Sequence, residues 1–194
     1  MLTRTYSALL LALLLVSRCL ADTCPGPSQE PATNAGWRVE GRYDQDQKAW
    51  LYIETGLTNG TCWTGRIDRI EAHAHLYFFL SADGRRFAVL DPMAGRRIDR
   101  RFLIYDSGGK LIASLGVTNI LNKAELDKMQ HTQDHVNWLK FDRATRTYGA
   151  YLPARNAIQL TTLAGRKVPI SLTDGRILSP EPPKPKRPPA NAPP

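Results

Sequence analysis

The sequence predicts a mainly β fold, an antiparallel meander, sandwich or barrel with one α-helix, and leaves an α+β arrangement as the alternative. Short runs rich in apolar, aromatic and β-branched residues recur between residues 37 and 178, and turn signals such as Asp-Gly and Gly-Gly separate them at short intervals. This spacing favours antiparallel hairpins. One segment, around residues 122–135, has the start signal and the composition of a helix.

The expected strands pair as hairpins along the chain. Each pair consists of two apolar runs that flank a turn of a few residues, and Asp83-Gly84 is a strong signal of this kind. In chain order, the turns are expected at residues 45–48, 83–84, 107–109, 143–145, 164–165 and 174–175. Residues 37–178 have the length of a single β-rich domain built on these strands.

The one expected helix runs from Lys123 to Asp134. Asn122 is a favourable N-cap, and Glu125 follows it three residues later, which is the capping-box pattern. Residues of high helix propensity come next. The helix is expected to connect a strand over residues 110–120 with a strand over residues 136–142.

The first 21 residues have the pattern of a secretory signal. An early Arg4 precedes an apolar run from Ala8 to Val16, and Cys19 and Ala21 supply the small side chains that a signal peptidase needs. The run is shorter than the ~20 residues that cross a bilayer, so we expect cleavage after Ala21 and no transmembrane segment in the mature chain. Arginine outnumbers lysine, which favours a GC-rich bacterial genome and therefore a periplasmic or secreted protein.

Two segments flank the expected domain. Residues 22–36 are expected to form an irregular leader, held by a disulfide between Cys24 and Cys62, which an oxidising compartment favours. This bond would contribute roughly 4 kcal/mol in the chain-entropy description. Residues 179–194 are dominated by proline, which predicts an extended or disordered tail. The tail is either a solvated spacer or a peptide that reaches through the cell wall or docks in an aromatic-lined groove.

The four histidines form two pairs with metal-chelating spacing. On a strand, His73 and His75 share one face, opposite an apolar face that should meet the core. On the expected helix, His131 and His135 lie opposite the apolar stripe. A site with all four histidine rings would therefore expose that stripe to solvent. This would forfeit the hydrophobic stabilisation of roughly 1.5–3 kcal/mol for each Leu or Met that is otherwise buried. Zinc or copper bound by His73 and His75 with Glu71 is the alternative to ordinary surface residues.

Six arginines cluster between residues 85 and 101, with Asp91 and Asp99 as the only acids among them. A guanidinium group binds carboxylates and phosphates through two parallel hydrogen bonds. An arginine-rich strand pair therefore predicts a docking surface, and its alternative is an edge strand protected by charge against aggregation. The predicted binding residues are Arg85, Arg86, Arg96, Arg97, Arg100 and Arg101.

Evidence for catalysis in the sequence is weak. Both mature cysteines are assigned to the disulfide, no serine lies in a Gly-x-Ser-x-Gly elbow, and Glu40, Glu54 and Glu71 are scattered among the expected strands. Core packing is expected for the four tryptophans, and a ligand platform is the alternative. No catalytic residue is therefore assigned, and an enzyme is the less favoured class.

The charge balance indicates the kind of partner. Without residues 1–21, which carry Arg4 and Arg18, the chain has 24 basic and 18 acidic residues, a net charge of +6. This favours another protein or an anionic envelope component, and nucleic acid is not expected for an exported protein. The sequence predicts a non-catalytic binding or accessory protein, such as an envelope-machine accessory, an inhibitor or an immunity protein. A periplasmic metal-binding protein or metalloenzyme is the alternative.

Overall fold

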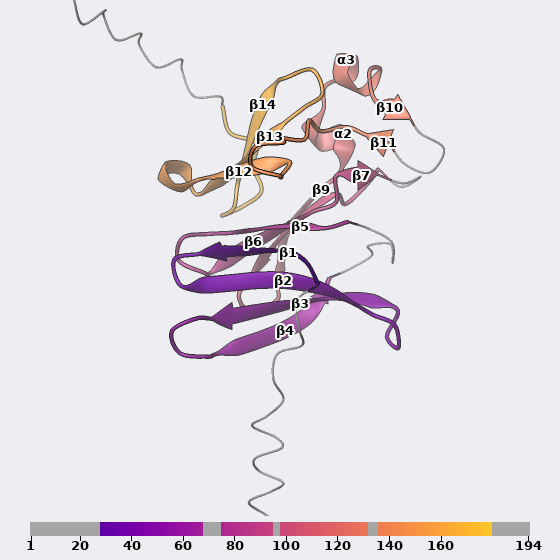
Figure 1. Ribbon diagram of the computed structural model, residues 1–194. Helices are drawn as coiled ribbons and strands as arrows, with labels where there is room; N and C mark the ends of the chain where they lie inside the picture. The colour runs from indigo at the N-terminus through magenta and orange to yellow at the C-terminus, as the bar shows by residue number, and fades with distance from the viewer. Residues whose placement is uncertain (1–27, 68–74, 95–97, 132–135, 180–194) are drawn as a thin grey trace, which may run out of the picture.

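The computed structural model describes residues 28–67, 75–94, 98–131 and 136–179, and strands dominate them (Figure 1). The prediction of a mainly β fold is confirmed. In chain order the elements are β1 (Ser28–Asn34), β2 (Trp37–Asp44), β3 (Ala49–Gly56), β4 (Cys62–Ile67), β5 (Tyr77–Leu80), β6 (Arg86–Leu90), β7 (Met93–Ala94), β8 (Phe102–Asp106), β9 (Leu111–Leu115), α2 (Val117–Ile120), α3 (Lys123–Leu126), β10 (Gln130–His131), β11 (Val136–Asn137), β12 (Gly149–Leu152), the 3-10 turn η1 (Pro153–Arg155), β13 (Ala157–Thr161) and β14 (Lys167–Ser171).

The strands form three sheets. The largest has the order β4-β3-β2-β1-β5-β6-β8-β9, and two three-stranded sheets have the orders β12-β13-β14 and β10-β11-β7. Neighbours pair antiparallel except β1 and β5, whose parallel pairing consists of the single register pair Glu30 and Tyr77. Figure 1 shows β1–β4 below β5 and β12–β14 above it. The weakly paired β1–β5 junction therefore joins two halves of one sheet that lie in different layers.

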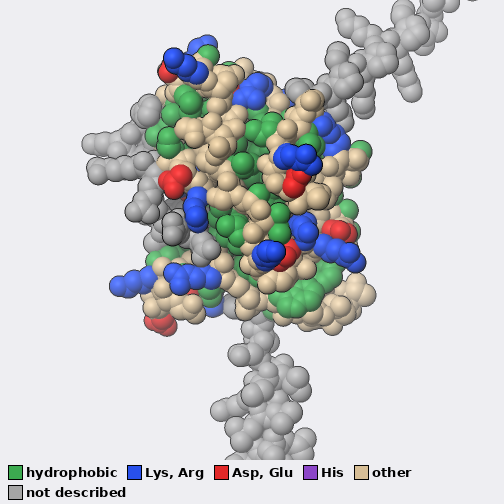
Figure 2. Space-filling view, turned by 180° about the vertical axis from the view of Figure 1, so that it is seen from behind, with side chains coloured by type: hydrophobic (Ala, Val, Ile, Leu, Met, Phe, Trp, Pro, Cys, Tyr) green, Lys and Arg blue, Asp and Glu red, His purple; other side chains and the backbone are tan. Residues whose placement is uncertain are grey.

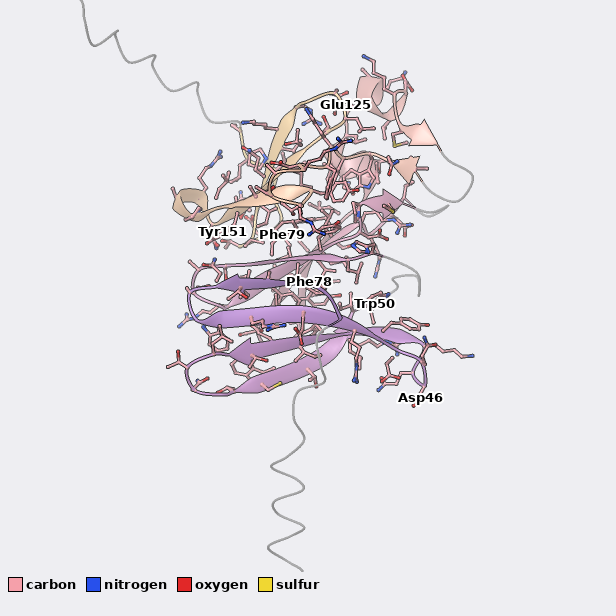
Figure 3. The ribbon with its side chains drawn as sticks, in the orientation of Figure 1. Asp46, Trp50, Phe78, Phe79, Glu125 and Tyr151 are labelled. Atoms are coloured by element: carbon pink, nitrogen blue, oxygen red, sulfur yellow. The ribbon has the colours of Figure 1, made fainter. Side chains whose placement is uncertain are left out.

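The central strands β5, β6 and β8 are buried on both faces. Alternate side chains of a strand point in opposite directions, and here each direction meets a separate hydrophobic core. Figure 3 shows Phe78 below β5 and Phe79 above it. The lower core contains Val39, Trp50, Tyr52, Ile67, Leu76, Phe78, Leu80, Phe87, Val89, Leu103 and Tyr105. The upper core includes Tyr77, Phe79, Ala88, Leu90, Phe102, Ile104, Val117, Ile120, Trp138, Ile158, Leu160, Val168 and Ile170.

Burial on both faces explains the uninterrupted apolar runs "YFFL", "FAVL" and "FLIY". A strand that is solvated on one face alternates apolar and polar residues, whereas a strand between two layers does not. In the expected strand over residues 71–80, the even-numbered side chains formed an apolar face, and the odd-numbered ones formed a face with both polar and apolar residues. In the structure β5 begins at Tyr77, and its mixed face is fully buried in the upper core.

Gly41 of β2 leaves room for an aromatic ring in the lower core. A Cβ at this position would lie 2.5 Å from Cζ of Phe78. The Phe78 ring, from the central layer, thus lies directly against the β2 backbone. Close packing of this kind tolerates added volume poorly.

Two further expectations about individual segments are wrong. The segment 22–36 was expected to be irregular, but Ser28–Asn34 forms β1, which pairs with β2. Residues 117–120 were expected to continue a strand but form α2, whose buried Val117 and Ile120 face the upper core. β1 forms a hairpin with the strand that follows it, and the packing of α2 against the upper core ends the expected strand at Leu115.

The expected helix over residues 123–134 is reduced to the four residues of α3. The capping box is present: the Glu125 amide donates to Asn122 Oδ1 at 3.0 Å, and the Asn122 amide donates to Glu125 Oε2 at 3.0 Å. The helix ends at Leu126, because residues 130–131 pair as β10 with β11. An isolated helix of this length is unstable, so contacts outside it must hold it in place.

Glu125 supplies those contacts. Its buried carboxylate accepts hydrogen bonds from the Thr162 hydroxyl at 2.8 Å and from Arg166 Nε at 3.0 Å, and Arg166 Nη2 also donates to the carbonyl oxygen of Ile120 at 2.7 Å. The hydrogen bond from Arg166 is the main reason that the pKa of Glu125 falls to about 2. The α3 turn is thus tied to the β13–β14 connection and to α2.

None of the helices in the described ranges combines the length and the apolar character that crossing a membrane requires.

Candidate functional site

The structure separates the predicted arginines. Arg85 and Arg86 lie at the start of β6, whereas Arg100 and Arg101 precede β8. These positions are at opposite ends of an antiparallel pair in which Arg86 is opposite Asp106 and Leu90 is opposite Phe102. Four residues of strand separate the two ends by roughly 14 Å. The expected arginine-rich strand pair is therefore not formed by the described residues: 98–101 are not a strand, and Arg96 and Arg97 lie outside the described ranges.

Arg101 is part of the interior rather than of a surface. Only 4% of the residue is exposed, and its guanidinium forms an ion pair with Asp91, which is 1% exposed. Asp91 Oδ1 also accepts a hydrogen bond from the Met93 amide at 3.1 Å. A buried pair of this kind costs several kcal/mol to break. Arg101 therefore fixes the connection between β6, β7 and β8 and is removed from the predicted docking surface.

The histidines do not form a metal site among the described residues. His75 is exposed, and its ring centroid lies 5.3 Å from that of Tyr77. His131 belongs to β10 and not to a helix, so the expected helical pair with His135 is wrong. His73 and His135 lie outside the described ranges. Within these ranges no three His, Cys, Asp or Glu side chains are placed to hold one ion, and the zinc or copper site stays a prediction. So does the disulfide, because Cys24 lies outside the described ranges.

Two of the four tryptophans form a partly exposed stacked pair. Trp50 and Trp138 are buried, with 3% and 0% exposure. The rings of Trp37 and Trp63 stack with centroids 5.2 Å apart and an interplanar angle of 13°. Trp63 is 38% exposed, and the neighbouring β3–β4 loop carries Leu57, which is 54% exposed. Core packing is therefore confirmed for Trp50 and Trp138, while a ligand platform at Trp37 and Trp63 stays a prediction.

The β5–β6 turn, which carries Arg85, packs against Trp37 of the stacked pair. Gly84 has φ +67°, and a Cβ there would lie 2.3 Å from Cδ1 of Trp37, so the turn backbone lies directly against the indole. Asp83 orders the turn by accepting hydrogen bonds from the Ser81 hydroxyl at 2.6 Å and from the Arg85 amide at 3.0 Å. The Ser81 hydrogen bond is the largest reason that the pKa of Asp83 is below its ordinary value. The exposed Arg85 side chain therefore projects from a fixed turn.

We group Trp37, Leu57, Trp63 and Arg85 as the indole–arginine surface and leave out Arg86, which on β6 shares the face of Ala88 and Leu90 toward the upper core. Arg86 is half-buried, and its Nη1 donates to the Arg85 carbonyl oxygen at 3.0 Å. Figure 2, seen from behind, shows hydrophobic side chains gathered next to Lys and Arg side chains over the lower layer. The surface therefore combines exposed aromatic area with positive charge.

Glu54 lies beneath this surface, in the lower layer. On β3 it shares the inward face with Trp50 and Tyr52, and its strand partners are Val39 on β2 and Trp63 on β4. The residue is 0% exposed, and neither carboxyl oxygen has a hydrogen-bond partner. Burial, followed by the nearby negative charge of Asp106, raises the pKa of Glu54 to about 7. Burial also raises the pKa of Tyr52, with smaller contributions from Glu54 and Asp106.

A carboxyl group with a pKa near 7 has the acidity that general acid catalysis at neutral pH requires. A catalytic acid must also touch the reacting group. Glu54 has no exposed surface, so a substrate cannot reach it in this structure. The arrangement is that of a partly exposed indole pair above a buried acid, and we assign no catalytic role to Glu54.

A hollow of about 320 Å³ lies at the β1–β5 junction. Thr33, Asn34, Phe79 and Tyr151 are among its lining residues, and none of the lining side chains is ionisable apart from the Tyr151 phenol. The Tyr151 hydroxyl already accepts from the Ala82 amide at 3.0 Å and donates to Asn156 Oδ1 at 3.2 Å. The hollow therefore lacks the charge that an anionic partner would need.

Sequence reasoning missed Glu54 as a distinct feature. In "AWLYIETG" it follows Trp50 and Tyr52 at a spacing of two, so it is the one acid on an aromatic face. That pattern could have identified it as a buried carboxyl group. Comparison with known protein families, with characterised proteins and with solved structures finds no match to this chain.

Proposed function

We propose that this is an exported, non-catalytic binding protein that docks an anionic protein or envelope component through the indole–arginine surface. The observation that carries the proposal is the exposed Trp63, stacked on Trp37, whose indole lies against the backbone of Gly84, the residue before Arg85. Trp and Arg dominate the energetic centres of binding interfaces. A guanidinium group also pairs with carboxylates and phosphates in a defined geometry.

The rigidity of the surface supports the proposal. Trp37 packs between Trp63 and the Gly84 backbone, and hydrogen bonds within the turn hold the chain on which Arg85 lies. Groups that are ordered before binding lose little conformational entropy when the partner arrives. The net charge of +6 without residues 1–21 favours approach of an anionic partner. Export rests on the expected signal in residues 1–21, outside the described ranges.

Calorimetric titration with two acidic polymers tests the binding role. Polyaspartate represents an acidic protein, polygalacturonate an acidic glycan, and neutral dextran is the control ligand. We expect one of the acidic polymers to bind and dextran not to bind. Trp63→Ala and Arg85→Glu should each weaken the binding about tenfold or more, which corresponds to about 1.4 kcal/mol.

Lys167→Glu is the matched control for charge. Lys167 is exposed at the start of β14, in the upper sheet, and its replacement changes the net charge by as much as Arg85→Glu does. The control should leave the affinity almost unchanged. Equal losses in the two charge variants would indicate non-specific attraction, and absence of binding to both acidic polymers would contradict the proposed function.

A further inference from the structure

We propose that Glu54 makes the indole–arginine surface proton-dependent: the protonated carboxyl group keeps Trp37 and Trp63 stacked, and loss of its proton loosens the pair and weakens partner binding. The binding part of this inference rests on the proposed function, whereas the effect on the indole pair does not. Its basis is the position of Glu54, fully buried and directly opposite Trp63 in the β3–β4 register.

Glu54 has no compensating partner in its surroundings. Both oxygens lack a hydrogen-bond donor. A neutral carboxyl group tolerates such a site, but a buried carboxylate without a partner is strongly unfavourable. When the proton leaves, the structure must therefore admit water or a donor to the Glu54 carboxylate. Of the two strand partners of Glu54, Val39 is buried and Trp63 is 38% exposed. The lower layer therefore opens most readily at Trp63, and opening it there displaces the Trp37–Trp63 pair.

The charged and titratable groups on the surrounding elements do not neutralise Glu54. On β2, Arg38 is occupied by Glu40 at 2.7 Å. Asp106, at the end of β8, is negative and raises the pKa of Glu54 further. The charged and titratable groups on β2, β3, β4, the start of β6 and the β5–β6 and β8–β9 turns are Arg38, Glu40, Arg42, Tyr43, Asp44, Tyr52, Arg66, Asp83, Arg85, Arg86, Asp106 and Lys110.

The direction of the effect follows from charge. Below pH 6 the Glu54 carboxyl group is protonated, because its pKa is raised to about 7. Above pH 8 it is ionised, and an extra negative charge then lies beneath a surface proposed to bind an anion. Loosening of the Trp37–Trp63 pair and repulsion of the partner both lower the affinity as the pH rises.

Nuclear magnetic resonance of the indole N–H groups tests the effect without a partner. The Trp63 signal, assigned with Trp63→Phe, should shift between pH 5 and pH 8.5 with a midpoint near neutrality. Glu54→Gln, which has the same shape but no proton to lose, should abolish the transition. Asp106→Asn should retain it with a lower midpoint, because a negative neighbour has been removed. Asp46→Asn, in the turn at the other end of β2, is the matched control and should leave the transition unchanged (Figure 3).

The binding part is tested by titrating whichever acidic polymer binds at pH 5.5 and again at pH 8.5. The wild-type affinity should fall at least threefold more than that of Glu54→Gln. A Trp63 transition that persists in Glu54→Gln would belong to another group and would overturn the inference. A Trp63 signal that does not titrate in the wild type would overturn it too, even if the polymer binds. A Trp63 signal that titrates in the wild type, without polymer binding at either pH, would support the effect of Glu54 on the indole pair and contradict the proposed function instead.

Discussion

Replacing Glu54 by glutamine should stabilise the protein at alkaline pH, although the residue is fully buried. The pKa of this group rises from an ordinary 4.5 to about 7. Between these two values the folded state holds a proton that the unfolded state has released, so the free energy of unfolding falls as the pH increases. At 1.36 kcal/mol per pH unit, the loss reaches about 3 kcal/mol above pH 7. Glutamine has no charge to bury and should avoid this loss.

Urea unfolding followed by tryptophan fluorescence measures the difference. At pH 4 the free energies of unfolding of the wild type and of Glu54→Gln should be nearly equal, because both side chains are neutral. At pH 8 the variant should be more stable by about 3 kcal/mol, with unchanged dependence on urea concentration. Asp46→Asn removes an exposed carboxyl group from the β2–β3 turn and should not show this difference.

An equal difference between the wild type and Glu54→Gln at pH 4 and pH 8 would refute the reasoning. It would mean that the Glu54 carboxylate is solvated or paired in the folded protein, contrary to its 0% exposure and its two unpaired oxygens.

Three further predictions concern the packing that holds the layers together. Glu125→Gln should destabilise the protein by about 2 kcal/mol at pH 7, a value reduced for the 37% exposure of the Arg166 side chain. Because the pKa of Glu125 is lowered to about 2, its contribution to stability is complete above pH 4.5 and is lost as the pH falls toward 2. Acid unfolding curves of the wild type and the variant would show this difference. Arg101→Met should cost about 3–5 kcal/mol because it removes the cation that the buried Asp91 carboxylate faces. A second change, Asp91→Leu, should recover part of the loss, and no recovery in thermal unfolding would contradict the ion-pair interpretation. Gly41→Ala should cost about 1–3 kcal/mol, since the added Cβ would lie 2.5 Å from the Phe78 ring; an unchanged midpoint in urea would show that the ring can move aside.

Short-range features of the fold could be predicted from the sequence. The Asp83-Gly84 turn forms between β5 and β6, and Asn122 and Glu125 form their capping box. In both cases the interacting groups are at most seven residues apart along the chain, as Leu80 and Phe87 are across the turn. The length of the helix could not be predicted in this way. Pairing of β10 with β11 ends it, and that pairing competes with local propensity.

The sequence by itself determined that this chain is a β protein with turns at defined places, since alternation and turn chemistry act between near neighbours. Only the tertiary structure decided that both faces of β5, β6 and β8 are covered, that Arg85 and Arg101 lie at opposite ends of a strand pair, and that Glu54 has no partner. These features depend on which distant strands lie side by side. The physical reason is that burial, pKa and surface exposure are set by neighbours in space, and in this protein those neighbours come from distant parts of the chain.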